Sequence, residues 1–273
     1  MDLGQKFSQS VSGHNMNYYR TGSGQPLLLV HGITTYSFIW RKIVPVLKTK
    51  FDVITVDLFG CGDSDMPLSI SYSIKDHAKY LKEFMAELKI SKFHFVGHDI
   101  GGGIGQRFAV ENPELLYDLT LINTVAYNFW PVQPIIAMRT PIIRQLAMAT
   151  LDQVTFKLIV KRGIYHKERV DQELMDYFWE PMKTKEGRKA FLHFAKSLNN
   201  NDLMEVEEQI HNLKMPVMVI RGDADPYLSS EIANRLHTEI SNCRLEVIPT
   251  GSHFIQEDEP EKVSELILDF LSG

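Results

Sequence analysis

Cysteine is scarce in this chain, which contains only Cys61 and Cys243. One falls in a tight-loop sequence and the other at the start of a late apolar run, so the pattern excludes a disulfide framework and favours a reducing compartment. Residues 1–6 lack the apolar core of a secretory signal. No apolar run approaches the length of a membrane-spanning helix. We therefore expect a cytoplasmic protein with no membrane partner.

An excess of one charge is also absent. The net charge is −5 and the isoelectric point is about 6.1, with acidic and basic residues interleaved. This composition predicts no nucleic-acid partner. There is no cysteine cluster, and we expect no metal. The glycine-rich segment 101–105 fits neither dinucleotide-binding nor phosphate-binding loop spacing. We therefore expect no cofactor.

Short β-type runs alternate with helical periodicity along the 273 residues. This alternation predicts an α/β fold with a mostly parallel sheet flanked by helices. The first two runs alternate polar and apolar residues, as in an antiparallel edge hairpin, whereas later runs are continuously apolar. The expected strands are 7–11, 15–20, 26–30, 53–56, 93–96, 119–122, 217–220 and 245–248.

Helical spacing of apolar residues predicts helices over 73–88, with Ser73 as N-cap, and over 259–270. Residues 125–203 break the strand–helix rhythm and carry aromatics and methionines at helical spacing. We interpret this stretch as a helical lid inserted after the sixth strand, with a core made of 1–124 and 204–273. A helical subdomain that only packs is the alternative, because aromatics at helical spacing are more often core than pocket.

The most informative segment is Gly97-His98-Asp99-Ile100-Gly101, which follows the apolar run 93–96. It has the pattern of a sharp strand-to-helix turn that presents a nucleophile at the top of a sheet, where the strand ends. The usual nucleophile is serine, but this chain has Asp99. A carboxylate attacks an sp³ carbon and leaves an alkyl ester on the enzyme, so the residue predicts both the site and the chemistry.

Two later segments complete a catalytic constellation. Asp223 and Asp225 follow the seventh strand, and His253 follows the eighth. The chain order of nucleophile, acid and histidine is typical of one class of catalytic triads. We interpret His253 as the base, because imidazole titrates near neutral pH. The acid is Asp225 or Asp223, and it would hold the imidazole tautomer and stabilise the imidazolium.

The chain resembles, over essentially its whole length, the α/β-hydrolases of the haloalkane dehalogenase and epoxide hydrolase branch. The resemblance rests on four segments, namely 31–32, 57–65, 97–99 and 251–254. It implies the α/β-hydrolase fold with an eight-stranded sheet, and it favours Asp225, which precedes a proline, as the acid. It also implies that His31 and His98 support the fold, and that segment 57–65 is a structural loop near the pocket.

An oxyanion hole on this site would use the backbone N–H groups of Ile33 and Ile100. The same two positions depart from the relatives. Haloalkane dehalogenases typically carry Trp directly after the nucleophile and Asn after His-Gly, and both donate hydrogen bonds to the halide, which isoleucine side chains cannot do. Trp130 or Trp179 of the lid are candidate replacements.

Epoxide hydrolases typically have proline two residues after His-Gly and two lid tyrosines that protonate the epoxide oxygen. Here the proline is missing, although Tyr127, Tyr165 and Tyr177 are available. We take Trp130 and Tyr165 as candidate substrate-binding residues.

The sequence thus predicts a cofactor-free hydrolase that works through an aspartyl ester on a small apolar organic substrate, as a monomer or homodimer. The electrophile is a haloalkane, an epoxide or a strained lactone. Alternatives are an esterase or lactone-opening hydrolase on the same triad, acid/base catalysis without a covalent step, and a hydrolase-fold protein that binds a ligand without turning it over.

Overall fold

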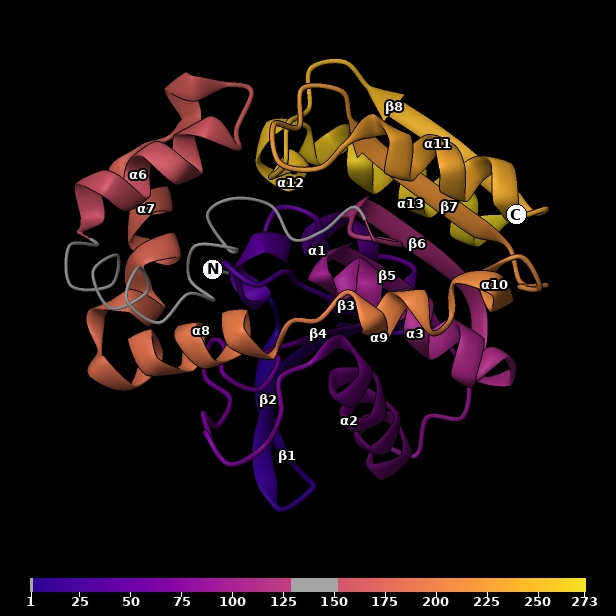
Figure 1. Ribbon diagram of the computed structural model, residues 1–273, viewed down its shortest axis with the longest axis horizontal. Coiled ribbons are helices and arrows are strands. Elements are labelled where there is room, and N and C mark those ends of the chain that lie inside the picture. The colour runs from indigo at the N-terminus through magenta and orange to yellow at the C-terminus, as the bar shows by residue number, and fades with distance from the viewer. Residues whose placement is uncertain (1, 129–151) are drawn as a thin grey trace.

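The computed structural model describes residues 2–128 and 152–273 and is built on one eight-stranded sheet (Figure 1). The strand order is β1-β2-β4-β3-β5-β6-β7-β8. β1 pairs with β2 and β2 with β4 in antiparallel fashion, and all other neighbours are parallel. The strands are β1 (Gln5–Val11), β2 (His14–Gly22), β3 (Gln25–Val30), β4 (Phe51–Val56), β5 (Phe93–Asp99), β6 (Leu116–Thr124), β7 (Val217–Gly222) and β8 (Cys243–Ile248).

The burial of each strand follows from its composition. β5 is buried along its whole length, and residues 27–30 of β3 are buried as well, because helices cover both faces of the central sheet. β1 lies at the edge of the sheet and is exposed on both faces over most of its length, although its alternating sequence is that of a strand with one buried face. All eight expected strands are present, and the predicted antiparallel hairpin is confirmed.

Helices flank the sheet on both faces. α2 packs against α3, which contacts β5 and β6, while α1 packs against α13 (Figure 1). The predicted cap of α2 is confirmed, since the Ser73 hydroxyl accepts the N–H of Asp76. The helices around the sheet are α1 (Val44–Leu47), α2 (Ile74–Glu87), α3 (Ile100–Glu111), α9 (Asn201–Met204), α10 (Glu207–Ile210), α11 (Ser230–Glu239), α12 (Ile255–Asp258) and α13 (Pro260–Ser272).

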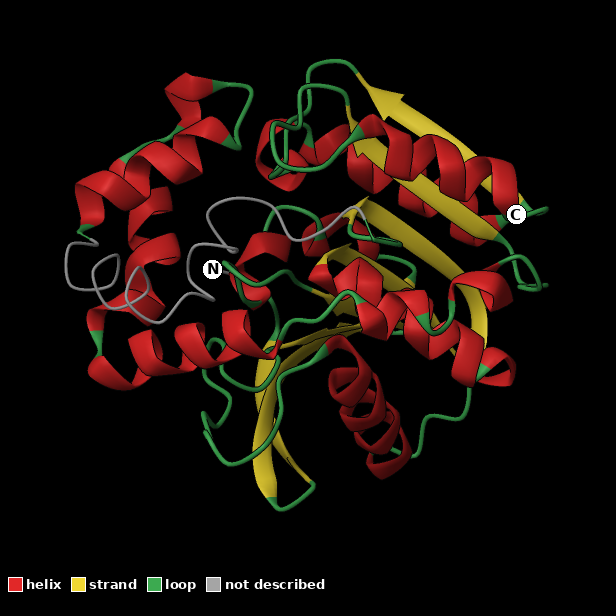
Figure 2. Cartoon of the chain, in the orientation of Figure 1, coloured by secondary structure: helices red, strands yellow, loops and turns green. Residues whose placement is uncertain are grey.

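Among the described residues, three further α-helices lie to one side of the sheet. They are α6 (Gln153–Arg162), α7 (Gln172–Trp179) and α8 (Lys185–Ser197). Residues 152–198, called here the α6–α8 segment, contain helices and loops but no strand (Figure 2). The arrows of β6, β7 and β8 point toward the side on which this segment lies (Figure 1). The carboxyl ends of the parallel strands therefore face the α6–α8 segment.

The strand order also locates a switch point. β3 lies between β4 and β5, so the chain leaves β3 toward one side and later returns to its other side. In open α/β sheets, ligands bind outside the carboxyl ends of strands at such a point. The loop after β3 and the turn after β5 meet there, which brings residues 31–33 next to Asp99.

Candidate active site

Asp99 occupies a strained turn between β5 and α3. Its backbone has φ 54° and ψ −118°, a conformation that residues other than glycine rarely adopt. The turn closes tightly because its flanking residues are glycines. A Cβ on Gly97 would collide with the carbonyl of Gly101, and a Cβ on Gly101 would collide with the carbonyl of Val30. The glycine spacing thus holds the carboxylate at the end of the sheet.

The Asp99 carboxylate is buried and faces backbone donors. Its Oδ2 accepts the N–H of Ile33 at 3.3 Å, and the N–H of Ile100 also hydrogen-bonds to the carboxylate. A Cβ on Gly32 would come within 2.5 Å of the same Oδ2, so glycine is required beside it. Burial raises the pKa of Asp99, and this outweighs the lowering by the His253 charge and by the two N–H groups.

His253 and Asp225 form a buried pair at the ends of β8 and β7. His253 Nδ1 lies 3.0 Å from Asp225 Oδ2. The other carboxylate oxygen accepts the N–H groups of Tyr227 at 2.8 Å and Leu228 at 3.2 Å, which orients the acid. Of the two aspartates considered as the acid, Asp225 contacts the histidine, whereas Asp223 is exposed.

Electrostatics couple this pair to Asp99. Burial lowers the pKa of His253, but the Asp225 carboxylate and its hydrogen bond, together with the Asp99 charge, outweigh it and raise the pKa above the usual 6.5. Burial raises the pKa of Asp225, but the His253 charge and the hydrogen bonds prevail and lower it. Asp225 therefore stays ionised, and a proton on His253 is stabilised by two carboxylates.

The two histidines expected to support the fold are buried and bonded to backbone. His31 Nδ1 lies 2.7 Å from the Gly32 carbonyl, and its Nε2 accepts the N–H of Leu58 at 3.0 Å. His98 Nε2 lies 2.9 Å from the His253 carbonyl. Burial lowers the pKa of His31 to about 4 and that of His98 to about 3, so both rings are neutral at pH 7.

The loop 57–65 is organised by its first residue. Asp57 is fully buried, and its carboxylate accepts the N–H of Ser37 at 2.8 Å and that of Asp63 at 3.0 Å. Burial raises the pKa of Asp57 to about 6 despite these hydrogen bonds. Because Ser37 begins the 3₁₀ turn after β3, the loop supports the segment that presents Ile33.

Aromatic rings connect the α6–α8 segment with the histidine. The ring centroid of Phe254 lies 4.9 Å from His253 and 4.8 Å from Phe178 of α7. Phe178 in turn lies 5.0 Å from Phe38, which follows β3. Tyr227 contacts the His253 ring edge-on at 5.2 Å, and its hydroxyl donates to the Ile159 carbonyl of α6 at 2.7 Å. Aromatic rings therefore pack around His253 on the side away from its charged partners Asp225 and Asp99.

Of the two candidate substrate-binding residues, the structure describes Tyr165. Trp130 is outside the described residues. The Tyr165 side chain is 44% exposed, and its N–H donates to the buried carboxylate of Asp258. Of the other aromatics considered, Tyr177 stacks on Phe38 at 5.5 Å, and Trp179 packs against other side chains of the α6–α8 segment.

Two buried residues close to the site were not singled out from the sequence. Asn123 lies near the end of β6 and hydrogen-bonds to the last residue of β7 and to the loop after β8. Arg221 near the end of β7 is 6% exposed, and its charge lowers the pKa of His253. The one sequence signal for each was a polar side chain directly beside an apolar strand run.

Within residues 2–128 and 152–273, no group of three or more His, Cys, Asp or Glu side chains is arranged to hold a metal. In the same ranges, no helix combines the length and apolarity needed to cross a membrane.

Comparisons with known proteins agree with this architecture. A family model described as alpha/beta hydrolase fold matches residues 25–260. The uncharacterized hydrolase YugF of Bacillus subtilis is 28% identical over 96% of this chain and 96% of its own length. Haloalkane dehalogenase 2 of Mycobacterium tuberculosis is 28% identical over 93% of this chain and 90% of its own length. The solved structure of the epoxide hydrolase CorEH superimposes with a TM-score of 0.87 over 98% of both chains at 20% identity, which shows likeness of fold alone.

Proposed function

This chain belongs to the alpha/beta hydrolase fold family, and we propose that it is a cofactor-free hydrolase that opens a small apolar electrophile through an ester on Asp99. The carrying observation is a buried carboxylate, in place of a hydroxyl, at the strained turn where backbone N–H groups converge. An ionised carboxylate has no proton to lose, so it needs no base to activate it, whereas a serine hydroxyl does. The carboxylate is a nucleophile for carbon bearing a leaving group.

In the first step, a carboxylate oxygen of Asp99 attacks the electrophilic carbon. The new C–O bond forms as the bond to the leaving group breaks, and the leaving group departs with the electron pair. The apolar surroundings of the site support this step, because a poorly hydrated carboxylate is a better nucleophile and competing water is kept out. His253 has no covalent role here.

In the second step, water attacks the carboxyl carbon of the ester and His253 takes a proton from it. The N–H groups of Ile33 and Ile100 stabilise the oxyanion of the tetrahedral intermediate, and Asp225 stabilises the imidazolium. Collapse of the intermediate releases an alcohol, whose proton comes from the imidazolium, and leaves Asp99 as a carboxylic acid. The acid then loses its proton, to solvent where the leaving group is a halide or to the leaving oxygen of an opened ring, and the Asp99 carboxylate is regenerated. The net reaction consumes one water and returns every enzyme group to its starting state.

The charges of the site support a role for His253 in the second step only. In the free enzyme the Asp99 carboxylate contributes to the raised pKa of His253. Ester formation removes that negative charge, so the pKa of His253 falls in the intermediate. The histidine therefore becomes a neutral base at the stage when one is required.

The leaving group distinguishes two candidate substrate classes, a haloalkane and a strained oxygen-containing ring. The side chains of Ile33 and Ile100 cannot donate hydrogen bonds, so the described part of the site lacks side-chain donors for a halide at those two positions. This favours ring opening of an epoxide or a strained lactone, whose leaving oxygen stays on the product. Likeness to haloalkane dehalogenase 2 favours the haloalkane instead.

His253→Gln tests the covalent step. Alkylation of Asp99 needs no base, whereas hydrolysis of the ester does, so the variant is expected to trap the adduct. Purified variant is incubated with 1-bromobutane, styrene oxide and β-butyrolactone, and intact-protein mass spectrometry followed by peptide mapping looks for the added mass on Asp99. Asp99→Asn carried through the same incubations is the control. A His253→Gln protein that stays unmodified with every probe would overturn the mechanism.

A further inference from the structure

Asn123 joins the two loops that carry His253 and Asp225, although the steps proposed above give it no part. Its side chain is almost fully buried at the end of β6. Nδ2 donates to the carbonyls of Ser252 at 2.8 Å and His253 at 2.9 Å, while Oδ1 accepts the N–H of Gly222 at 2.9 Å. One carboxamide thus spans the ends of three neighbouring strands.

The backbone of Asn123 is held in an uncommon conformation. Its φ is 38°, in the left-handed region where side chains other than glycine and asparagine are rare. Such a conformation is strained and persists only where surrounding contacts hold it. Here the three hydrogen bonds of the side chain do so. The strained backbone and the three side-chain hydrogen bonds therefore occur at the same residue.

The bonds of Asn123 bear directly on the histidine–acid pair. The Gly222 carbonyl accepts the N–H of Asp225 at 3.1 Å, so Gly222 is the first residue of the turn that carries the acid. The His253 carbonyl accepts a second bond from His98 Nε2 at 2.9 Å. The backbones on both sides of the His253–Asp225 contact are therefore tied to the same amide.

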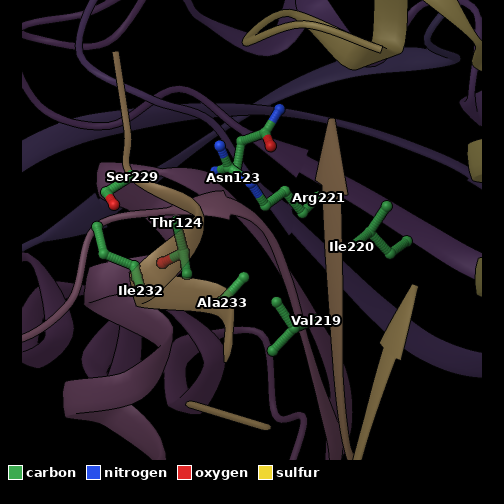
Figure 3. Close-up of a pocket in the computed structure, with 8 residues that line it drawn as sticks. All are labelled: Asn123, Thr124, Val219, Ile220, Arg221, Ser229, Ile232 and Ala233. Carbon is green, nitrogen blue, oxygen red and sulfur yellow. The ribbon is translucent and has the colours of Figure 1, made fainter. Parts of the chain in front are cut away.

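A small cavity lies beside Asn123. Asn123 and Arg221 are among the residues that line it, and its volume is about 10 Å³, roughly room for one water (Figure 3). Loss of the carboxamide would leave a void near the end of β6 that water can enter. Water can satisfy the freed N–H and carbonyl groups, but it cannot hold two loops at a fixed separation.

We propose that Asn123 is a positioning residue that sets the separation of the acid-bearing turn and the histidine loop, and thereby the His253–Asp225 hydrogen bond. Its consequence for turnover rests on the function proposed above. Asp99 itself receives no bond from Asn123. Loss of the amide is therefore expected to slow ester hydrolysis and to spare alkylation.

Asn123→Gly is the decisive variant, because glycine suits the positive φ while it removes the whole carboxamide. Asn123→Ala gives the same loss with added backbone strain. The matched control is Gln106→Ala. Gln106 is also a fully buried amide, and its Nε2 donates to Thr124 Oγ1 at 2.9 Å and the Val125 carbonyl at 2.8 Å, but it bonds to neither loop.

The first measurement needs no substrate. Proton NMR follows the low-field Nδ1–H resonance of His253, assigned by its disappearance in His253→Gln. We expect the resonance to shift or broaden in Asn123→Gly and to stay in place in Gln106→Ala. An unchanged resonance in folded Asn123→Gly would overturn the positioning role whatever reaction the protein catalyses.

The second measurement is kinetic. With a probe that alkylates His253→Gln, rapid quench and mass spectrometry give separate rates for alkylation and hydrolysis. We expect Asn123→Gly to hydrolyse the ester about 10- to 100-fold more slowly, because a small misplacement of a catalytic group costs this much, and to accumulate adduct. Hydrolysis at the wild-type rate, or equal slowing of both steps, would contradict the proposal. Failure of His253→Gln to form any ester would refute the proposed function, with the NMR result still deciding the role of Asn123.

Discussion

Replacement of Asp258 is expected to detach the α6–α8 segment from the histidine loop. This carboxylate is fully buried at the end of α12 and accepts three backbone N–H groups. Two belong to the α6–α8 segment, Tyr165 at 2.8 Å and His166 at 3.0 Å. The third is the N–H of Ser252 at 2.9 Å, directly before His253. One side chain therefore fastens both segments.

The magnitude follows from these three donors. A hydrogen bond to a charged acceptor contributes about 1.5–3 kcal/mol when buried. The N–H of Ser252 lies in a buried residue, but those of Tyr165 and His166 lie closer to the surface, where water can replace the acceptor. Asp258→Ala is thus expected to lower the free energy of unfolding by about 2–4 kcal/mol. Asp258→Asn, which keeps one acceptor oxygen, is expected to lose about half as much.

Equilibrium unfolding in urea measures the change, and Glu259→Ala is the matched control. Glu259 is the next residue, and it contacts His166 at 3.2 Å with both side chains about a quarter exposed. An ion pair in that setting contributes at most about 1 kcal/mol. If Asp258→Ala were no less stable than Glu259→Ala, the inference that this buried carboxylate fastens the two segments would be refuted.

Three further outcomes are expected. Asp225→Asn should still form the ester with an alkylating probe but hydrolyse it about 10³- to 10⁴-fold more slowly in rapid-quench kinetics, because the histidine loses its orienting charge; an unaffected hydrolysis rate would exclude Asp225 as the acid. Hydrolysis of the ester should fail at low pH as His253 becomes protonated. The pKa of this acidic limb should be lower than the pKa of His253 measured by NMR titration of the free enzyme, because Asp99 carries no charge in the ester. Equal pKa values would contradict this argument. Gly32→Ala should abolish alkylation, since its Cβ would come within 2.5 Å of Asp99 Oδ2; measurable adduct formation in a folded variant would show that the turn can yield.

The strands could be predicted because burial on two faces demands continuous apolar runs. Their ends could not, since the carboxyl ends carry polar residues that break the run. The fifth strand was expected to stop at Val96 but continues to Asp99, and the seventh was expected to stop at Ile220 but continues to Gly222. These extensions are where the candidate site begins.

The candidate site was predictable where one residue type carries the chemistry, as for Asp99. It was not where the role depends on neighbours distant in sequence. Asn123 has no pattern of its own, because its three partners come from β7 and the loop after β8. Asp223 and Asp225 share one turn, so the residues alone left both open. The family resemblance favoured Asp225, and Asp225 is the one that contacts the histidine. Helical spacing likewise could not tell that the Tyr165 side chain is partly exposed.

A single turnover in ¹⁸O-labelled water tests the central claim most directly. With enzyme in excess over a probe that it turns over, water should attack the ester at its carboxyl carbon, so the label should enter the Asp99 carboxylate and the product should carry an unlabelled oxygen from the enzyme. Mass spectrometry measures the ¹⁸O content of the peptide that contains Asp99 and that of the product. Label found in the product of that first turnover, with none on Asp99, would mean that water attacks the substrate directly and that Asp99 is not a nucleophile.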